Sequence, residues 1–308
     1  MKDEKIATRK SYGEALKNVG KINKNIVVLD ADLAGATKSD IFKNEFPDRF
    51  FDMGISEQDM IATAAGMATC GKIPFASTFA VFATGRAYDQ IRNSVCYPKL
   101  NVKICGSHAG ITVGEDGATH QMLEDINIMK GLPNMRVFCP SDDIQTKWLV
   151  EEISKINGPC YIRTARMDSN VIYEEEQKFE IGRAIQIGDG TDATIFAIGV
   201  CVAEALKAKE KLEEQNINVR VVDMFSLKPV DKEMIIKCAK ETKKLFSVED
   251  HSVIGGLGSI ISDVLTEEYP TKLIKIGIDD RFGESGKANE LMKKFKIDCD
   301  AIVEKIKS

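Results

Sequence analysis

The sequence lacks the features that would place the chain in a membrane or on a polyanion. It contains no uninterrupted apolar run of membrane-spanning length, and residues 1–10 are charged without an apolar core. Neither a transmembrane helix nor a secretory signal is therefore expected. The net charge is -5, and lysine and arginine are spread along the chain without a basic stripe. Nucleic acids and anionic membranes are consequently poor candidate partners.

Cysteine pairs with metal-binding spacing are also absent. The eight cysteines include no C-x-x-C pair and do not cluster with the three histidines, which argues against a structural zinc site. Without a secretory signal, the thiols are expected to be reduced and the protein cytoplasmic. With 308 residues, of which 44% are hydrophobic and 29% charged, the chain is long enough for two ordinary domains.

Short apolar runs alternate with helical patterns along the chain. In the first half, we expect strands at 26–29, 102–105 and 161–164, and helices at 11–19, 56–71, 85–96 and 142–157.

The second half begins with two apolar runs, 181–187 and 193–198, which are separated by a turn and predict a hairpin. Alternating helices and strands follow, so the fold class is α/β with mostly parallel sheets. Residues 168–178 are polar and aperiodic, and are expected to link two doubly wound domains, 1–172 and 179–308.

One segment of the first half concentrates groups that can transfer protons. Residues 106–121 contain His108 and His120, the adjacent acids Glu115 and Asp116, and four glycines. Glycines let the backbone approach a ligand closely, and the imidazole and carboxyl groups can exchange protons. This composition indicates a polyol-binding or proton-transfer loop, although a turn-rich surface loop with solvated charges would look similar.

A second segment, 54–60, has the sequence G-I-S-E-Q-D-M and precedes a helical run. Ser56 and Asp59 have the spacing of a capping box, which places Glu57 in the first turn of the helix. Taken alone, an acid in this position most often complements the helix dipole.

Five segments together, in this order, resemble transketolase. They are A-T-R-K (7–10), A-D-L (31–33), G-I-S-E-Q (54–58), T-F-A-V-F (78–82) and V-G-E-D-G-A-T-H-Q (113–121). The resemblance runs from about residue 7 to the end of the chain. It corresponds to the thiamine-diphosphate pyrimidine-binding domain of the family, followed by its C-terminal α/β domain.

The resemblance also implies a partner. Full-length transketolases begin with a diphosphate-binding domain, which carries the Mg²⁺ and diphosphate ligands and has no counterpart here. The chain therefore resembles the C-terminal subunit of a split transketolase whose N-terminal subunit supplies that domain. In the family, thiamine diphosphate lies between two chains, so this subunit would supply half of each site. We expect self-association through both domains and a heterotetramer that contains both subunits.

Four residues match positions around the cofactor. Glu57 matches the glutamate that hydrogen-bonds N1′ of the aminopyrimidine, which promotes the 4′-imino form able to remove the thiazolium C2 proton. Phe79 and Phe82 match the aromatic pocket of the pyrimidine ring, with core packing as the alternative. Asp32 matches an acid near the thiazolium and would otherwise cap a helix.

Five residues match positions that contact substrate. His120, the second predicted catalytic residue, and Asp116 match contacts to the donor sugar hydroxyls near the scissile carbon bond. His108 matches a histidine of the same channel, toward the phosphate end. Arg9 and Arg166 match arginines that grip the sugar phosphate, a task suited to planar bidentate donors. Surface salt bridges are the alternative for both arginines.

The predicted activity is ketol transfer, as in the pentose phosphate pathway. A two-carbon unit would pass from a ketose phosphate to an aldose phosphate, with thiamine diphosphate and Mg²⁺ as cofactors. The beta subunit of a 2-oxo-acid dehydrogenase is the nearest alternative, and deoxyxylulose phosphate synthase is a more distant one. A non-catalytic assembly module with the same fold is the alternative from a different class.

Overall fold

Three sheets organise the chain in a computed structural model that describes residues 1–308. The largest sheet belongs to the first half and has seven strands in the order β12-β6-β7-β5-β4-β2-β3, all parallel to their neighbours except β12. Its strands are β2 (Ile26–Asp30), β3 (Phe50–Asp52), β4 (Ile73–Phe79), β5 (Lys103–Ser107), β6 (Arg136–Phe138), β7 (Cys160–Arg163) and β12 (Ser226–Lys228). The helices of this half are α1 (Thr8–Ile22), α2 (Ala34–Thr37), α3 (Asp40–Glu45), α4 (Glu57–Thr69), α5 (Tyr88–Gln90), α6 (Asp125–Lys130) and α7 (Asp143–Lys155), with short 3-10 or π segments η1 (Pro47–Arg49), η2 (Val81–Arg86), η3 (Ile91–Cys96) and η4 (Ile111–Val113).

Strand β2 shows why its apolar run, Ile26–Leu29, is uninterrupted. Ile26 and Val28 pack in a core cluster with side chains of α1 and α7, whereas Val27 and Leu29 pack in another with side chains of α4. Successive side chains of a strand point to opposite faces of the sheet. Because helices cover both faces, every position of the strand is buried, as is usual for parallel sheets.

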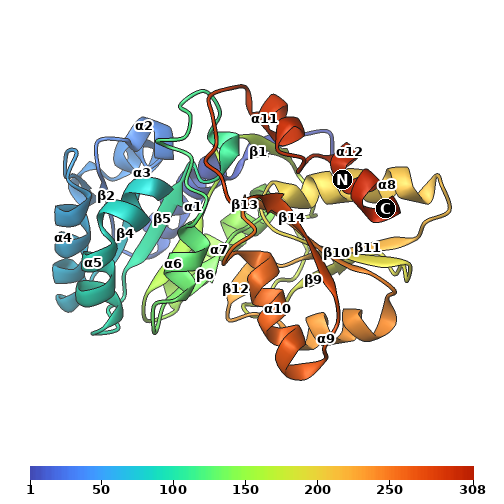
Figure 1. Ribbon diagram of the computed structural model, residues 1–308. Helices are drawn as coiled ribbons and strands as arrows, with labels where there is room; N and C mark the ends of the chain where they lie inside the picture. The colour runs from blue at the N-terminus through green and yellow to red at the C-terminus, as the bar shows by residue number, and fades with distance from the viewer.

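The second half forms a five-stranded sheet in the order β14-β13-β10-β11-β9. Its strands are β9 (Ile185–Ile187), β10 (Ala193–Ala197), β11 (Val219–Asp223), β13 (Leu245–Ser252) and β14 (Leu273–Ile278). Its helices are α8 (Cys201–Glu213), α9 (Lys232–Glu241), α10 (Leu257–Glu268), α11 (Ala288–Lys294) and α12 (Cys299–Lys307). Figure 1 shows the two halves side by side, blue to green at the left and yellow to red at the right. The predicted α/β class with mostly parallel sheets is confirmed.

One local prediction for the second half was wrong. The expected hairpin does not form, because β9 pairs antiparallel with β11 while β10 lies between β11 and β13. All residues of β10 are buried, which requires neighbours on both sides, whereas β9 is only partly buried. The segment expected to link the two domains, 168–178, contains ordered contacts. It begins with β8 (Asp168–Asn170), which pairs with β1 (Lys5–Ala7), and continues to the buried Tyr173, which donates a hydrogen bond to Asp223 at 2.7 Å.

The two halves share both a sheet and a core. Strand β12 lies in the second half of the sequence but pairs antiparallel with β6 of the first-half sheet. One cluster of 36 buried apolar side chains contains residues of both halves, among them Leu29 and Leu257. The halves are therefore packed through a continuous interior.

A buried polar network reinforces this junction. The Arg163 Nε donates to Asp125 Oδ2 at 2.9 Å, and its Nη2 donates to the backbone oxygen of Asp250 in β13 at 2.7 Å. The Tyr161 hydroxyl also donates to Asp125 Oδ2, at 2.8 Å. The carboxylate of Asp250, in the second half, accepts a hydrogen bond from the backbone N–H of Ile111, in the first half, at 2.8 Å. Each buried charge thus has partners, as burial requires.

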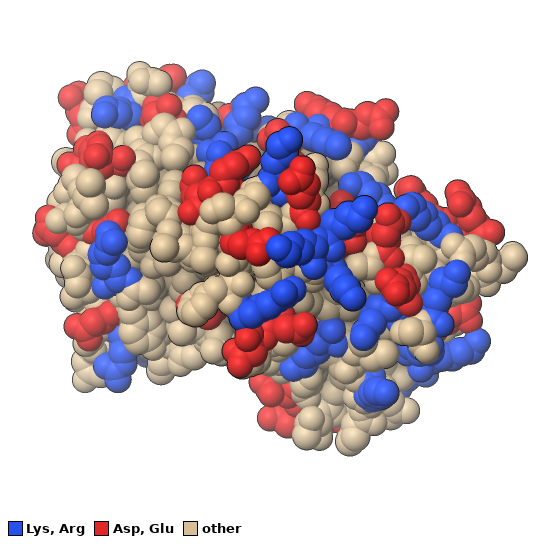
Figure 2. Space-filling model, turned by 45° about the horizontal axis from the view of Figure 1, so that its top comes forward, with Lys and Arg blue, Asp and Glu red and all other residues tan.

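The surface is mixed in charge. On the face shown in Figure 2, acidic and basic side chains are interspersed without a continuous stretch of one sign, and the area over the first half is comparatively poor in charge. No helix combines the length and apolar character needed to cross a lipid bilayer.

Candidate active site

The predicted site residues of the first half gather at one edge of its sheet. Phe79 is the last residue of β4, His108 directly follows β5, and Arg166 follows β7. These strands are adjacent and parallel, so their carboxyl ends share an edge. That edge is where open α/β sheets bind ligands.

Glu57 enters this edge as the first residue of α4. Its side chain is only 1% exposed, and Oε2 accepts a hydrogen bond from Nη1 of Arg86 at 2.7 Å. The other oxygen accepts no hydrogen bond within the chain. The predicted capping box is not formed, since the Ser56 side chain makes no cap hydrogen bond. The acid at this helix start is thus buried and ion-paired rather than solvated.

Two phenylalanines continue the series of contacts that starts at this acid and Arg86. After Phe79 the chain passes into η2, a π-helix that carries Phe82 and Arg86. The two aromatic rings are nearly parallel, with centroids 5.9 Å apart and an interplanar angle of 10°. The guanidinium carbon of Arg86 lies 4.5 Å from the Phe82 centroid. Single π-helical turns are common at functional sites. This one places Arg86 so that it contacts both the carboxylate of Glu57 and the ring of Phe82.

His108 extends the cluster from β5. Its ring stacks on Phe79 with centroids 4.0 Å apart, and its ring nitrogens approach Ser107 Oγ at 2.8 Å and Arg9 Nη1 at 3.3 Å. Burial, followed by the positive charges of Arg9 and Arg166, lowers the pKa of His108 to about 3. His108 is therefore a neutral hydrogen-bonding group at physiological pH. The ring edge of His120 approaches the same phenylalanines, 6.1 Å from Phe79.

Two arginines give this end of the cluster a positive charge. Arg9, in the first turn of α1, donates from Nη1 to the backbone oxygen of Ala36 at 2.9 Å. Burial, and then the charge of Arg166, lowers the pKa of Arg9. Arg166 donates to the backbone oxygen of Val113 at 2.8 Å and lies 3.5 Å from Asp116 Oδ2. Arg166 also lies 3.7 Å from Glu115 Oε2, whereas Arg9 has no carboxylate partner. A guanidinium pair of which one member lacks a counter-charge is suited to an anion.

Family comparisons match the two halves separately. Residues 4–170 match the transketolase pyrimidine-binding domain, and residues 182–302 match the transketolase C-terminal domain. The chain belongs to the transketolase family.

Relatives of two lengths cover almost the whole chain. A transketolase C-terminal section from Methanocaldococcus jannaschii is 52% identical over 301 residues, which cover 97% of this chain and 94% of that protein. The transketolase of Rattus norvegicus is 42% identical over 308 residues, which cover 99% of this chain but 49% of that protein. The chain thus spans about half the length of that transketolase.

A solved structure agrees over the same extent. It is described as a split gene transketolase, an inactive beta4 tetramer, and it matches with a TM-score of 0.91 and 49% identity. The match covers 98% of this chain and 97% of that one.

Within this transketolase chain, the predicted residues differ in how closely they are joined. Contacts connect Glu57, through Arg86, Phe82, Phe79 and His108, to Arg9. Asp32 is not in that series. It is exposed beyond the end of β2 with a φ of 61°, and its carboxylate makes no hydrogen bond or ion pair. Asp116 is tied to the cluster only through Arg166, and both lie at the rim.

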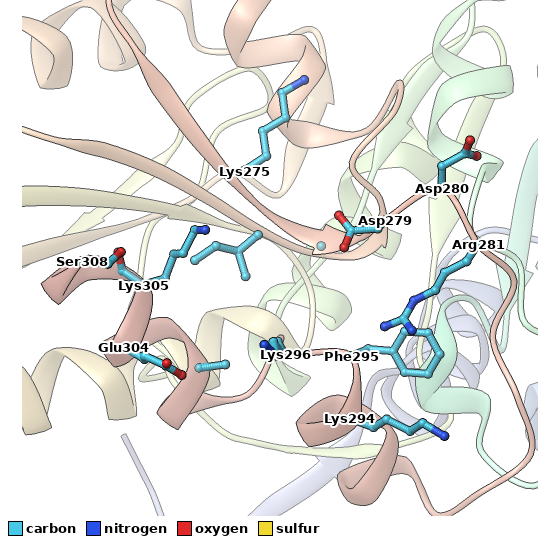
Figure 3. Close-up of a pocket in the computed structure, with 13 residues that line it drawn as sticks. Lys275, Asp279, Asp280, Arg281, Lys294, Phe295, Lys296, Glu304, Lys305 and Ser308 are labelled. Carbon is cyan, nitrogen blue, oxygen red and sulfur yellow. The ribbon is translucent and has the colours of Figure 1, made fainter.

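The principal cavities lie away from these residues. The largest, about 660 Å³, is in the second half between the end of β14 and helices α11 and α12. Figure 3 shows its lining, which contains both basic side chains, among them Lys294, Lys296 and Lys305, and acidic ones, among them Asp279 and Glu304. No predicted site residue lines it. The residues joined by contacts from Glu57 to Arg9 line none of these principal cavities, and Glu57, Phe79 and His108 are themselves buried. No group of three or more His, Cys, Asp and Glu side chains could hold a metal ion.

Two residues that support the cluster were not predicted. Arg86 was missed because an arginine in a helical segment usually lies on the surface, although its spacing from Phe82 gave a signal. Asp30, at the end of β2, is buried and accepts hydrogen bonds from Leu33 N, Thr37 Oγ1 and Ser39 Oγ at 2.6–2.8 Å. Burial raises its pKa to about 6. These bonds hold the segment that contains α2, and the backbone oxygen of Ala36 in α2 accepts the hydrogen bond from Arg9.

Proposed function

We propose that this chain is the C-terminal subunit of a two-subunit transketolase in the cytoplasm. With an N-terminal subunit that carries the diphosphate-binding domain, it would transfer a two-carbon ketol unit from a ketose phosphate to an aldose phosphate. Thiamine diphosphate and Mg²⁺ would be the cofactors, with the Mg²⁺ ligands on the N-terminal subunit. The observation that carries this proposal is the series of contacts from Glu57 to Arg9. Glu57 and the two phenylalanines form the end at which the cofactor would bind, called the cofactor end. Arg9 and Arg166 form the end at which an anion would bind, called the anion end.

The residues at the cofactor end fit an aminopyrimidine ring. A buried carboxylate with one oxygen free of hydrogen bonds is joined through Arg86 to two nearly parallel aromatic rings. Glu57 would share a proton with a ring nitrogen, and Phe79 and Phe82 would orient the flat ring through offset or edge contacts. When bound, thiamine diphosphate would supply the nucleophilic carbon that attacks the ketose carbonyl.

The residues at the other end fit a phosphorylated sugar. Arg9 and Arg166 would hold the phosphate by bidentate hydrogen bonds. His108 stays neutral, so it would donate or accept a hydrogen bond without adding charge. His120, half-buried beside the two phenylalanines, would contact the sugar hydroxyls between the two ends. A 2-oxo-acid dehydrogenase subunit would handle small acyl groups and has no need of the phosphate grip.

The absence of a principal cavity at the predicted residues supports a need for a partner. None of the principal cavities contains the predicted residues, which is expected for a half-site completed by another chain. The similar solved chain is described as an inactive tetramer of beta chains. We infer that this chain also self-associates, and that its domains, 1–172 and 179–308, become active only after the N-terminal subunit joins.

Reconstitution tests the proposal. The chain would be mixed with its N-terminal subunit, thiamine diphosphate and Mg²⁺, and assayed with xylulose 5-phosphate and an aldose phosphate, or with pyruvate. We expect ketol transfer and no pyruvate turnover. Glu57→Ala should lose roughly a hundred- to ten-thousand-fold in turnover, whereas Asp59→Asn, an exposed acid in the same helical turn, should be unaffected. Activity without the partner, or near-normal turnover of Glu57→Ala, would contradict the proposal.

A further inference from the structure

Arg86 is the cation that contacts the buried carboxylate of Glu57. The Arg86 side chain is 45% exposed, whereas that of Glu57 is almost fully buried. Its guanidinium donates to the carboxylate at 2.7 Å and also lies over the ring of Phe82. A long side chain thus reaches inward from the surface and neutralises a buried acid at the cofactor end of the cluster.

This arrangement meets a physical need of the unloaded chain. A buried carboxylate without a partner is strongly unfavourable, so some donor must pair with Glu57 before cofactor arrives. Guanidinium is planar, donates hydrogen bonds in its plane and stacks on aromatic faces. A pyrimidine ring that lies against Phe82 would need the aromatic face that Arg86 covers, even though the second oxygen of Glu57 is free to accept a hydrogen bond. Arg86 and that ring therefore compete.

We propose that Arg86 is a placeholder for the cofactor ring, an inference that rests on the proposed function. In the unloaded chain Arg86 pairs with the carboxylate of Glu57 and covers Phe82. When the aminopyrimidine ring docks, Arg86 moves toward solvent. Its departure is needed because the guanidinium occupies the face of Phe82 that the ring would take, and Arg86 cannot leave that face without giving up its hydrogen bond to Glu57. Arg86 is then a positioning residue that acts through Glu57.

The first test uses the chain without cofactor. Arg86→Gln should lower the midpoint of thermal unfolding, because the Glu57 carboxylate loses its only ion-pair partner. The double variant Glu57→Gln/Arg86→Gln should recover most of that loss, because the buried charge is removed as well. Arg92→Gln, an exposed arginine that contacts only the side chain of Asn93, is the matched control and should not change the midpoint. An unchanged midpoint for Arg86→Gln would overturn the placeholder role.

The second test measures binding of thiamine diphosphate by calorimetry, with Mg²⁺ and the N-terminal subunit present and no substrate. Because the ring no longer displaces a charge-assisted hydrogen bond, Arg86→Gln should bind about tenfold more tightly than the unmodified chain. Arg86→Lys keeps the charge without the planar group and should fall between them. Weaker or equal binding by Arg86→Gln would overturn the inference while leaving the proposed function intact. If the unmodified complex binds no thiamine diphosphate, the proposed function fails, and this inference with it.

Discussion

The buried pair of Arg163 and Asp125 allows a quantitative prediction about the junction between the two halves. The side chains are 7% and 0% exposed, and the pair is held at 2.9 Å. Asp125→Asn removes the negative charge but keeps the shape and an acceptor for Tyr161. The guanidinium of Arg163 then lacks its counter-charge in a dry interior. Removing one partner of a buried pair costs about 3–5 kcal/mol in the free energy of unfolding.

The lower end of that range applies here. Arg163 retains its hydrogen bond to the backbone oxygen of Asp250 in the variant, so we expect a loss of about 3 kcal/mol. For a chain of this size each kcal/mol shifts the unfolding midpoint by roughly 2 °C. Asp125→Asn should therefore lower the midpoint by about 6 °C.

Thermal unfolding followed by circular dichroism measures this shift, and two further variants interpret it. Replacing Asp125 and Arg163 together by leucine removes both charges and should restore most of the lost stability. Glu151→Gln breaks an exposed pair with Lys155 and should leave the midpoint unchanged. If Asp125→Asn unfolds within 1 °C of the unmodified chain, removing the counter-charge of Arg163 does not lower the free energy of unfolding as expected for a buried pair.

Three further changes address the interior and the anion end. Burial raises the pKa of Asp223 to about 6, so the ionised carboxylate lowers the free energy of unfolding. Asp223→Asn should therefore raise the urea midpoint at pH 8. The gain should shrink as the pH falls through 6 toward 4, because Asp223 is then protonated in the folded chain. A pH-independent difference would be inconsistent with this account. Gly110 has a φ of 85°, and a Cβ there would overlap the carboxylate of Asp250, so Gly110→Ala should destabilise the chain by at least about 2 kcal/mol in urea unfolding. In the reconstituted enzyme, Arg166→Gln should raise the KM of the phosphorylated donor about tenfold or more while kcat changes little, and an unchanged KM would remove Arg166 from the phosphate site.

Much of the first-half fold could be predicted because its strands are buried on both faces. The run at 26–29 is apolar without interruption, the runs at 102–105 and 161–164 are apolar apart from Lys103, Arg163 and Thr164, and each lies within or overlaps a strand of the parallel sheet. The helix predicted at 85–96 is instead divided among π-helical and α-helical segments, because a π turn depends on tertiary contacts that leave no periodic signal.

Long-range pairing explains the other errors. Strand β12 is three residues long and joins a sheet built by residues far earlier in the chain, so no local pattern marks it. The pairing of β9 with β11 rather than with β10 likewise depends on which strands become neighbours in the folded chain, and the local sequence does not determine this. The candidate site was located through motifs, but the partner of Glu57 was not. Burial of that acid creates the need for Arg86, and burial is a property of the folded chain.

Strand β12 has a practical consequence for anyone who wishes to express the halves of this protein as modules. A cut between residues 172 and 179 would strip β12 from β6 and leave a bare row of amide and carbonyl groups on the truncated sheet. Such an exposed edge invites pairing with other molecules, so the isolated first module is expected to aggregate. Supplying residues 226–228 on a short appended segment would be the simplest remedy.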